Sequence, residues 1–226
     1  MDQKMWNRTF RIFGVGVLLC ASSAFAGVNL TLTGAGNNGM LSGVYVGPYQ
    51  GTVNGVSMPI ICDDFYDDTW LNEAWTATAS TFSDLSQTRF ASDSNATTQY
   101  EQAAWLSTQL LNNASCIYSQ ANCAGDIQFA IWQVFDKEPL TLLTGNNLLN
   151  AQYWLNQAQS QTFTPGEFSD FTIYTPTSCL RNCGVTLPQE FIVRTPEPPE
   201  LAILATDFSA AGGLLFWLYR RRTKRA

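Results

Sequence analysis

The chain of 226 residues contains no histidine, and only 13% of its residues are charged. Without an imidazole, the sequence excludes Ser/His/Asp and Cys/His nucleophile pairs, histidine acid–base chemistry and histidine-ligated zinc. It also offers no recognisable glycosidase carboxylate pair and no phosphate-binding loop. We therefore expect a protein that is not an enzyme and that needs no cofactor.

Positive charge is scarce in the middle of the chain. Between residues 27 and 195, four basic residues stand against fourteen acidic residues, which gives this segment a net charge of −10. A surface of that sign repels phosphate, so nucleic acid is excluded as a partner. The other basic residues gather at the two ends of the chain: Lys4, Arg8, Arg11, Arg220, Arg221, Arg222, Lys224 and Arg225.

The N-terminal end has the pattern of a secretory signal peptide. A basic start is followed by an apolar stretch over residues 12–20 and by the small-residue site Ala24-Phe25-Ala26. This order predicts a signal peptide over residues 1–26 that is removed after Ala26. The remaining chain is therefore expected to be exported.

The C-terminal end predicts a transmembrane helix. Residues 201–219 are mostly apolar, and as a helix they rise about 28 Å, which nearly matches a hydrocarbon layer of about 30 Å. Asp207 raises the free energy of membrane insertion by up to about 3 kcal/mol, so insertion of this helix into the membrane is favourable but marginal. The cluster Arg220-Arg221-Arg222 follows at once, and the positive-inside rule places it in the cytoplasm.

Pro196, Glu197 and Pro198 stand just before this helix. The order of Pro-Glu-Pro, apolar helix and terminal Arg cluster over residues 195–226 resembles the PEP-CTERM sorting signal. The resemblance implies an exosortase-type sorting enzyme of Gram-negative, biofilm-forming bacteria as a partner. The protein would be anchored in the inner membrane at first, then cut near Pro-Glu-Pro and passed to the cell surface or the extracellular matrix.

Apolar periodicity predicts that residues 27–194 form one α+β domain. Alternating apolar residues at 28–32 and 75–79, with the turn pair Asn54-Gly55, predict β-strands. Helical spacing follows at 100–111, 127–135 and 148–158, and β patterns return at 168–175 and 185–193. We expect a β-barrel or sandwich-like sheet with a helical insertion, Asp126 as the cap of the second helix, and a mobile polar loop over residues 81–99.

Six cysteines occur, and removal of Cys20 with the signal peptide leaves an odd number in an oxidising compartment. Close spacing predicts two local disulfides, and a metal site is the minor alternative. The expected pairs are Cys116 with Cys123 and Cys179 with Cys183. Cys62 is left over, either as a small buried apolar residue or as a thiol that is chemically occupied.

Four carboxylates follow Cys62 within six residues: Asp63, Asp64, Asp67 and Asp68. This spacing could suit calcium, but the glycine and terminal glutamate of an EF-hand loop are missing, so a solvated loop is favoured. An aspartate that lies close to Cys62 in space would raise the pKa of its thiol.

Three segments together resemble the bacterial thioester domains of surface adhesins. They are Ile-Cys-Asp-Asp at Cys62, the helix at residues 100–106, and Gln128-Phe-Ala-Ile-Trp132, and the resemblance spans residues 45–159. It implies an internal thioester between Cys62 and Gln128, although Ile127 replaces the threonine of the family motif. The thioester would react with an amine of a partner, either a surface protein or a polysaccharide matrix, while helix N-terminal amides support the oxyanion and Trp132 shields the bond. The alternative is a non-covalent structural component of the biofilm matrix.

We expect the C-terminal helix to be absent from the mature protein when the host carries the matching sorting enzyme. A marginal membrane anchor beside Pro-Glu-Pro suits transient retention, so without that enzyme the chain should stay in the membrane fraction. Cell fractionation and intact mass measurement test this. Recovery of only full-length, membrane-bound chain from the native cell would contradict release.

Overall fold

The fold was analysed in a computed structural model, which describes residues 27–118 and 123–195. The predicted signal peptide, transmembrane helix, sorting motif and basic tail lie outside the described residues. Within the described part, no helix is long and apolar enough to cross a membrane. The described chain therefore corresponds to the domain predicted between the two ends.

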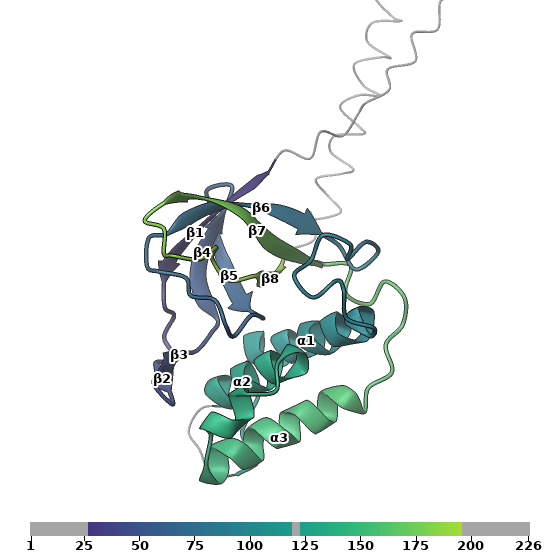
Figure 1. Cartoon of the computed structure of the whole chain (residues 1–226). Helices are drawn as coiled ribbons and strands as arrows, with labels where there is room; N and C mark the ends of the chain where they lie inside the picture. The colour runs from purple at the N-terminus through teal and green to yellow at the C-terminus, as the bar shows by residue number, and fades with distance from the viewer. Residues whose placement is uncertain (1–26, 119–122, 196–226) are drawn as a thin grey trace, which may run out of the picture.

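Six antiparallel strands close into a barrel in the order β1-β4-β5-β8-β7-β6 (Figure 1). Their bounds are β1 Val28–Gly34, β4 Tyr49–Val53, β5 Val56–Cys62, β6 Ala74–Ser80, β7 Phe171–Arg181 and β8 Phe191–Arg194. The predicted mixed α+β fold is confirmed, and of the two sheet arrangements expected, the structure has the barrel. Closure leaves the six strands no open edge, which removes a common route to aggregation.

The alternation read from the sequence points the apolar side chains into the barrel. Leu30, Trp75 and Ala77 are buried, and Leu30 pairs with Trp75 across β1 and β6. Asn54 and Gly55 form the tight turn between β4 and β5, with φ values of 49° and 82°. These positive φ values are those that a two-residue hairpin turn requires, and Asn-Gly adopts them readily.

A second sheet of two short strands stands apart from the barrel. It consists of β2 (Met40–Leu41) and β3 (Val44–Tyr45) and is called the β2–β3 ribbon below. Leu41 and Val44 pack against the barrel core, whereas Met40 and Tyr45 are more than half exposed. Val44 and Val46 alternate with polar or exposed residues, a pattern that predicts a strand but does not show that the strand leaves the barrel.

Three helices are inserted between β6 and β7 and form a layer against one end of the barrel (Figure 1). They are α1 (Ala96–Leu111), α2 (Ala124–Phe135) and α3 (Gly145–Gln159), with the short 3-10 helix η1 (Pro139–Leu142) before α3. Helix α2 packs against both α1 and α3. All of its residues from Asp126 to Trp132 are buried, so α2 is the central helix of the layer.

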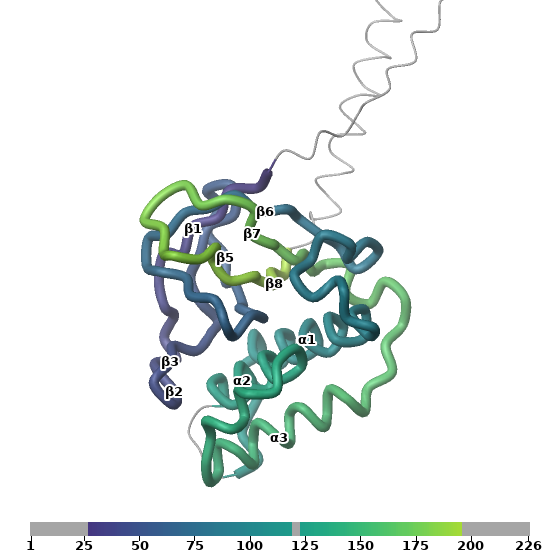
Figure 2. The backbone as a smooth tube through the Cα atoms, viewed as in Figure 1, coloured from purple at the N-terminus to yellow at the C-terminus, as the bar shows by residue number. Residues whose placement is uncertain are grey.

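Two local expectations were wrong. The second helix begins at Ala124 with Cys123 as its N-cap, so Asp126 lies within the first turn. The loop before α1 is not a loose polar segment, because it folds back between the barrel and α1 (Figure 2). There the backbone N–H of Arg89 donates to Glu190 at 2.8 Å, and that of Phe90 donates to the Tyr100 hydroxyl at 3.2 Å.

Replacement of Ile131 by alanine should lower the free energy of unfolding by about 2 to 5 kcal/mol, because its side chain is fully buried in the central helix. The matched control is Ile117→Ala, since Ile117 is 54% exposed and its loss should change stability by less than about 0.5 kcal/mol. Urea unfolding of the full chain measures both. Equal losses in the two variants would contradict the central place of α2.

Candidate functional site

The described cysteines comprise two disulfides and one free thiol. Cys116 is bonded to Cys123 and Cys179 to Cys183, so the structure contains both expected pairs. Cys62 is the free cysteine of the described chain, and its exposed fraction is 0%. The question for function is therefore what surrounds this buried thiol.

Cys62 is the last residue of β5, where the barrel meets the helical layer. Its backbone pairs with Phe191 of β8, which fixes the strand end. The thiol donates a hydrogen bond of 2.9 Å to the main-chain carbonyl of Asp64, so the chain turns back over the sulfur directly after the strand. The end of β5 and the turn at Asp64 thus hold the sulfur inside the domain.

Burial raises the pKa of the Cys62 thiol well above its usual value, and the nearby carboxyl groups of Asp64 and Asp63 raise it further. The expected effect of the following aspartates is therefore present. The indole N–H of Trp132 acts in the opposite direction and lowers the pKa, although the pair does not reach the geometry of a full hydrogen bond. The thiol is protonated at rest, and Trp132 is the group placed to stabilise its anion.

Gln128 lies directly against Cys62. It is the fifth residue of α2, and its exposed fraction is 0%. Its amide Nε2 donates a hydrogen bond of 2.7 Å to the main-chain carbonyl of Cys62. The structure thus brings together the two residues that the sequence pattern singled out, across 66 positions of the chain.

The carbonyl oxygen of this amide has a different environment from its nitrogen. Gln128 Oε1 is buried and has no hydrogen-bond partner within the described part, so in the unreacted carboxamide it accepts no bond from the amides at the start of α2. It faces Gly47, where an added Cβ would lie only 2.7 Å from Oε1. Gly47 therefore leaves the space that the carboxamide needs, and sequence reasoning missed it because nothing local marks this glycine.

Aromatic rings close the other side of the site. Trp132 is 2% exposed and packs against Phe65 and Phe129, with ring centroids 5.3 and 5.1 Å away. Phe65 lies in the segment after the strand, and its ring packs with the two rings of α2 in the same apolar cluster as Cys62. A site enclosed in this way keeps water from the Cys62–Gln128 pair.

A second buried group of polar side chains lies beside the thiol. Asp63 is fully buried, and neither of its carboxyl oxygens has a hydrogen-bond partner in the described chain. Glu190 is equally buried and accepts hydrogen bonds from the hydroxyls of Tyr100, at 2.5 Å, and Thr175. Burial raises the pKa of both carboxyl groups, and the proximity of Glu190 adds to the rise at Asp63.

Arg89 forms ion pairs with Asp64 and Asp67, so a cation of the protein itself occupies the acidic cluster. The favoured expectation of a solvated loop was wrong for Asp63 and Asp64, which are buried. Two groups of described side chains lie close enough to share a metal ion, but each includes both cysteines of a disulfide. Their sulfurs are bonded to each other and are not available as thiolate ligands.

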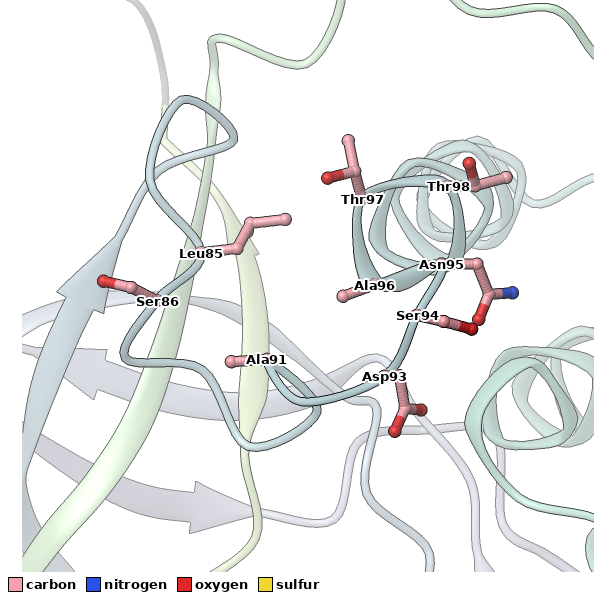
Figure 3. A pocket seen from close by; sticks show the side chains of 9 residues that line it. All are labelled: Leu85, Ser86, Ala91, Asp93, Ser94, Asn95, Ala96, Thr97 and Thr98. Atoms are coloured by element: carbon pink, nitrogen blue, oxygen red, sulfur yellow. The ribbon is translucent and has the colours of Figure 1, made fainter.

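A surface hollow of the described chain lies elsewhere. It measures about 350 Å³ and is formed by the loop before α1 and the first residues of that helix (Figure 3). Its lining residues are Leu85, Ser86, Ala91, Asp93, Ser94, Asn95, Ala96, Thr97 and Thr98. Neither Cys62 nor Gln128 lines it, and both are fully buried.

No protein-family model matches the chain, and no curated protein or solved structure matches it. The candidate site is therefore defined by its own geometry. A buried thiol and a buried carboxamide meet at the junction of β5 and α2, between Gly47 on one side and Trp132 on the other.

Replacement of Asp63 by asparagine should raise the free energy of unfolding at pH 7. The pKa of Asp63 in the folded state lies above the unfolded value of about 3.9, so folding takes up a proton. The unchanged chain is thus most stable when the pH lies below the unfolded pKa of about 3.9. Its free energy of unfolding falls as the pH rises through the folded pKa, by about 1 kcal/mol per pH unit. Asparagine stays neutral at every pH, so the Asp63→Asn variant lacks this loss of stability.

Urea unfolding between pH 4 and pH 7 measures the effect, with the difference between variant and unchanged chain narrowing toward pH 4. Asp68→Asn is the control, because Asp68 is exposed. Parallel stability curves for Asp63→Asn and the unchanged chain would contradict the raised pKa.

Proposed function

We propose that this chain is an exported surface protein that forms an internal thioester between Cys62 Sγ and Gln128 Cδ and uses it to attach covalently to an amine-bearing partner. The observation that carries the proposal is the buried hydrogen bond of 2.7 Å from Gln128 Nε2 to the Cys62 carbonyl. It holds the leaving nitrogen of the carboxamide against the residue that bears the nucleophile. Such proximity is what a difficult acyl transfer needs.

The chemistry is acyl transfer without turnover. The Cys62 sulfur attacks Gln128 Cδ, the C–N bond breaks, and the thiol hydrogen leaves with the nitrogen as ammonia. A partner amine later attacks the same carbon, the C–S bond breaks, and the sulfur recovers a hydrogen from the amine. The product is an amide that joins the partner to Gln128, and each molecule acts once, so the protein is not an enzyme.

The enclosure of the pair supports this function. A thioester is hydrolysed by water, and the full burial of Cys62 and Gln128 keeps water away until a partner arrives. The indole N–H of Trp132 favours the thiolate, which is the attacking species in the first reaction and the leaving group in the second.

Display on the cell surface rests on the two ends of the chain. The signal peptide would export the domain, and the C-terminal helix with the sorting motif would hold it in the inner membrane until an exosortase-type enzyme passes it outward. The described chain begins just before β1 and ends just after β8, so both attachment points adjoin barrel strands (Figure 1). The partner is an amine-bearing surface protein or a polysaccharide of the extracellular matrix.

The full chain, produced in an oxidising compartment, should weigh less than its sequence by one ammonia beyond the hydrogens lost in the disulfides and any cleaved signal peptide. It should resist thiol alkylation at Cys62 while folded and gain the mass of methylamine when offered it. Intact mass measurement and peptide mapping test these outcomes. Cys62→Ser and Gln128→Ala should each abolish the mass deficit and the adduct.

The matched control is Gln99→Ala. Gln99 is also a buried glutamine whose Nε2 donates to a main-chain carbonyl, but that carbonyl belongs to Val134, at 3.0 Å, and not to a cysteine. Its replacement should leave the mass deficit in place. Free alkylation of Cys62 in the folded chain with no ammonia missing would contradict the thioester and leave the non-covalent matrix role.

A further inference from the structure

We propose that the outer side of α3 is an interface through which two copies of this chain associate as a twofold-symmetric dimer. The inference goes beyond the proposed function and does not depend on the thioester. Three observations carry it: the exposure of one side of α3, the absence of charge from that side, and the exposed apolar side chains that lie around it.

Helix α3 is the helix of the inserted layer that lies farthest from the barrel (Figure 1). Its buried residues face the rest of the layer and are Asn150, Ala151, Trp154 and Ala158. Its exposed side chains are those of Asn146, Leu149, Gln152, Asn156 and Gln159. These five positions recur every three or four residues, so they form one stripe along the helix, which is called the α3 face below.

Charge is absent from this part of the chain. No acidic or basic residue occurs between positions 139 and 166, although about four would be expected over that length at the average of 13% for the chain. The net charge of −10 is therefore carried by other parts of the domain. An exposed surface without charge promotes association, because no like charges keep two such surfaces apart.

Exposed apolar side chains lie around the start of α3. Leu142 of η1 is 48% exposed, and Ser42 of the β2–β3 ribbon donates a hydrogen bond of 2.9 Å to its carbonyl, which places the ribbon and the exposed Met40 nearby. The Asn150 side chain bonds the N–H and the carbonyl of Tyr118, at 2.9 and 3.2 Å, and Tyr118 is 42% exposed. Aromatic residues and methionine are enriched in the centres of protein interfaces, where charged residues are depleted.

The chemistry of the α3 face favours a second copy of this chain as its occupant. A twofold dimer brings the same surface of both copies together, so charges of one sign would repel across it. A side-chain amide is both donor and acceptor and can pair with another amide of the same kind. A cationic partner would instead be drawn to the acidic parts of the domain, which lie outside this face.

The middle of α3 is the natural place for the twofold axis. Gln152 is the central residue of the helix and is exposed, so an axis at this point pairs it with the same residue of the second copy. The 15 residues of α3 rise about 22 Å, along which two antiparallel copies can pack. One helix with its flanks buries a small area, so the association belongs to the weak and transient class of interfaces.

Sedimentation velocity of the full chain in detergent micelles, at about 1 to about 100 µM, tests the dimer. The unchanged chain should pass from monomer toward dimer over this range. Gln152→Glu and Gln152→Lys should each weaken association at least about tenfold, because each places two like charges at the axis. An equal mixture of the two variants should associate again, because Glu then faces Lys.

The matched control is Gln50→Glu. Gln50 is an exposed glutamine of the barrel strand β4, so the same chemical change there should leave the dissociation constant unchanged. The predicted transmembrane helix is identical in all these chains, so a difference between them reports on α3. Urea unfolding of each variant checks that the fold is retained.

Three results would overturn the dimer. The first is a chain that stays monomeric up to about 100 µM, which would leave the α3 face to a different protein or to a polysaccharide. The second is a dimer that the Gln152 variants weaken no more than Gln50→Glu does. The third is a mixture of the two Gln152 variants that fails to associate. None of these results bears on the thioester, which the ammonia deficit tests separately.

Discussion

The hydrogen bond between the Gln128 amide and the Cys62 carbonyl is the contact on which the rest of the site depends. It joins the last residue of a barrel strand to the central helix of the inserted layer, and both partners are fully buried. The strand end is fixed by its pairing with β8, and α2 is fixed by packing against α1 and α3. The relative position of thiol and carboxamide is therefore set by the two halves of the fold together and not by a flexible loop.

Burial protects the site from water, and it also hinders ionisation of the thiol. An enclosed thiol near the carboxyl groups of Asp64 and Asp63 has a raised pKa and is slow to ionise, so the same enclosure that excludes water would also oppose the first step of the proposed thioester formation. Trp132 offsets part of this opposition with its indole N–H. The buried pair of Asp63 and Glu190 adds a further cost to the folded state at neutral pH. The buried groups near the site thus lower the stability of the fold, as is common at functional sites.

Local patterns predicted the parts of the fold that local chemistry determines. The Asn54-Gly55 turn, the three helices and the two short-range disulfides follow from spacing alone, and the structure contains them. Contacts between distant segments were not predictable from local patterns. Arg89 and Glu190, for example, are 101 positions apart, and the hydrogen bond between them holds the loop before α1 against the segment before β8. Gly47 was missed for the same reason, because its role comes from an oxygen on α2. The start of α2 was misplaced because Asp126 has the side chain of a cap but is the third residue of the helix, within its first turn.

The insertion of the helices between β6 and β7 determines how a bound partner would pull on the domain. If Gln128 is joined to a partner and the C-terminal end is held at the cell, tension runs only through residues 128–195. That path includes the rest of α2, then α3, β7 and β8, whereas α1 and the strands β1 to β6 carry no load along their own backbone. The Cys179–Cys183 disulfide lies on this path and Cys116–Cys123 lies outside it. Mechanical resistance of the attachment would thus depend on how firmly β7 and β8 are held by their unloaded neighbours, β6 and β5.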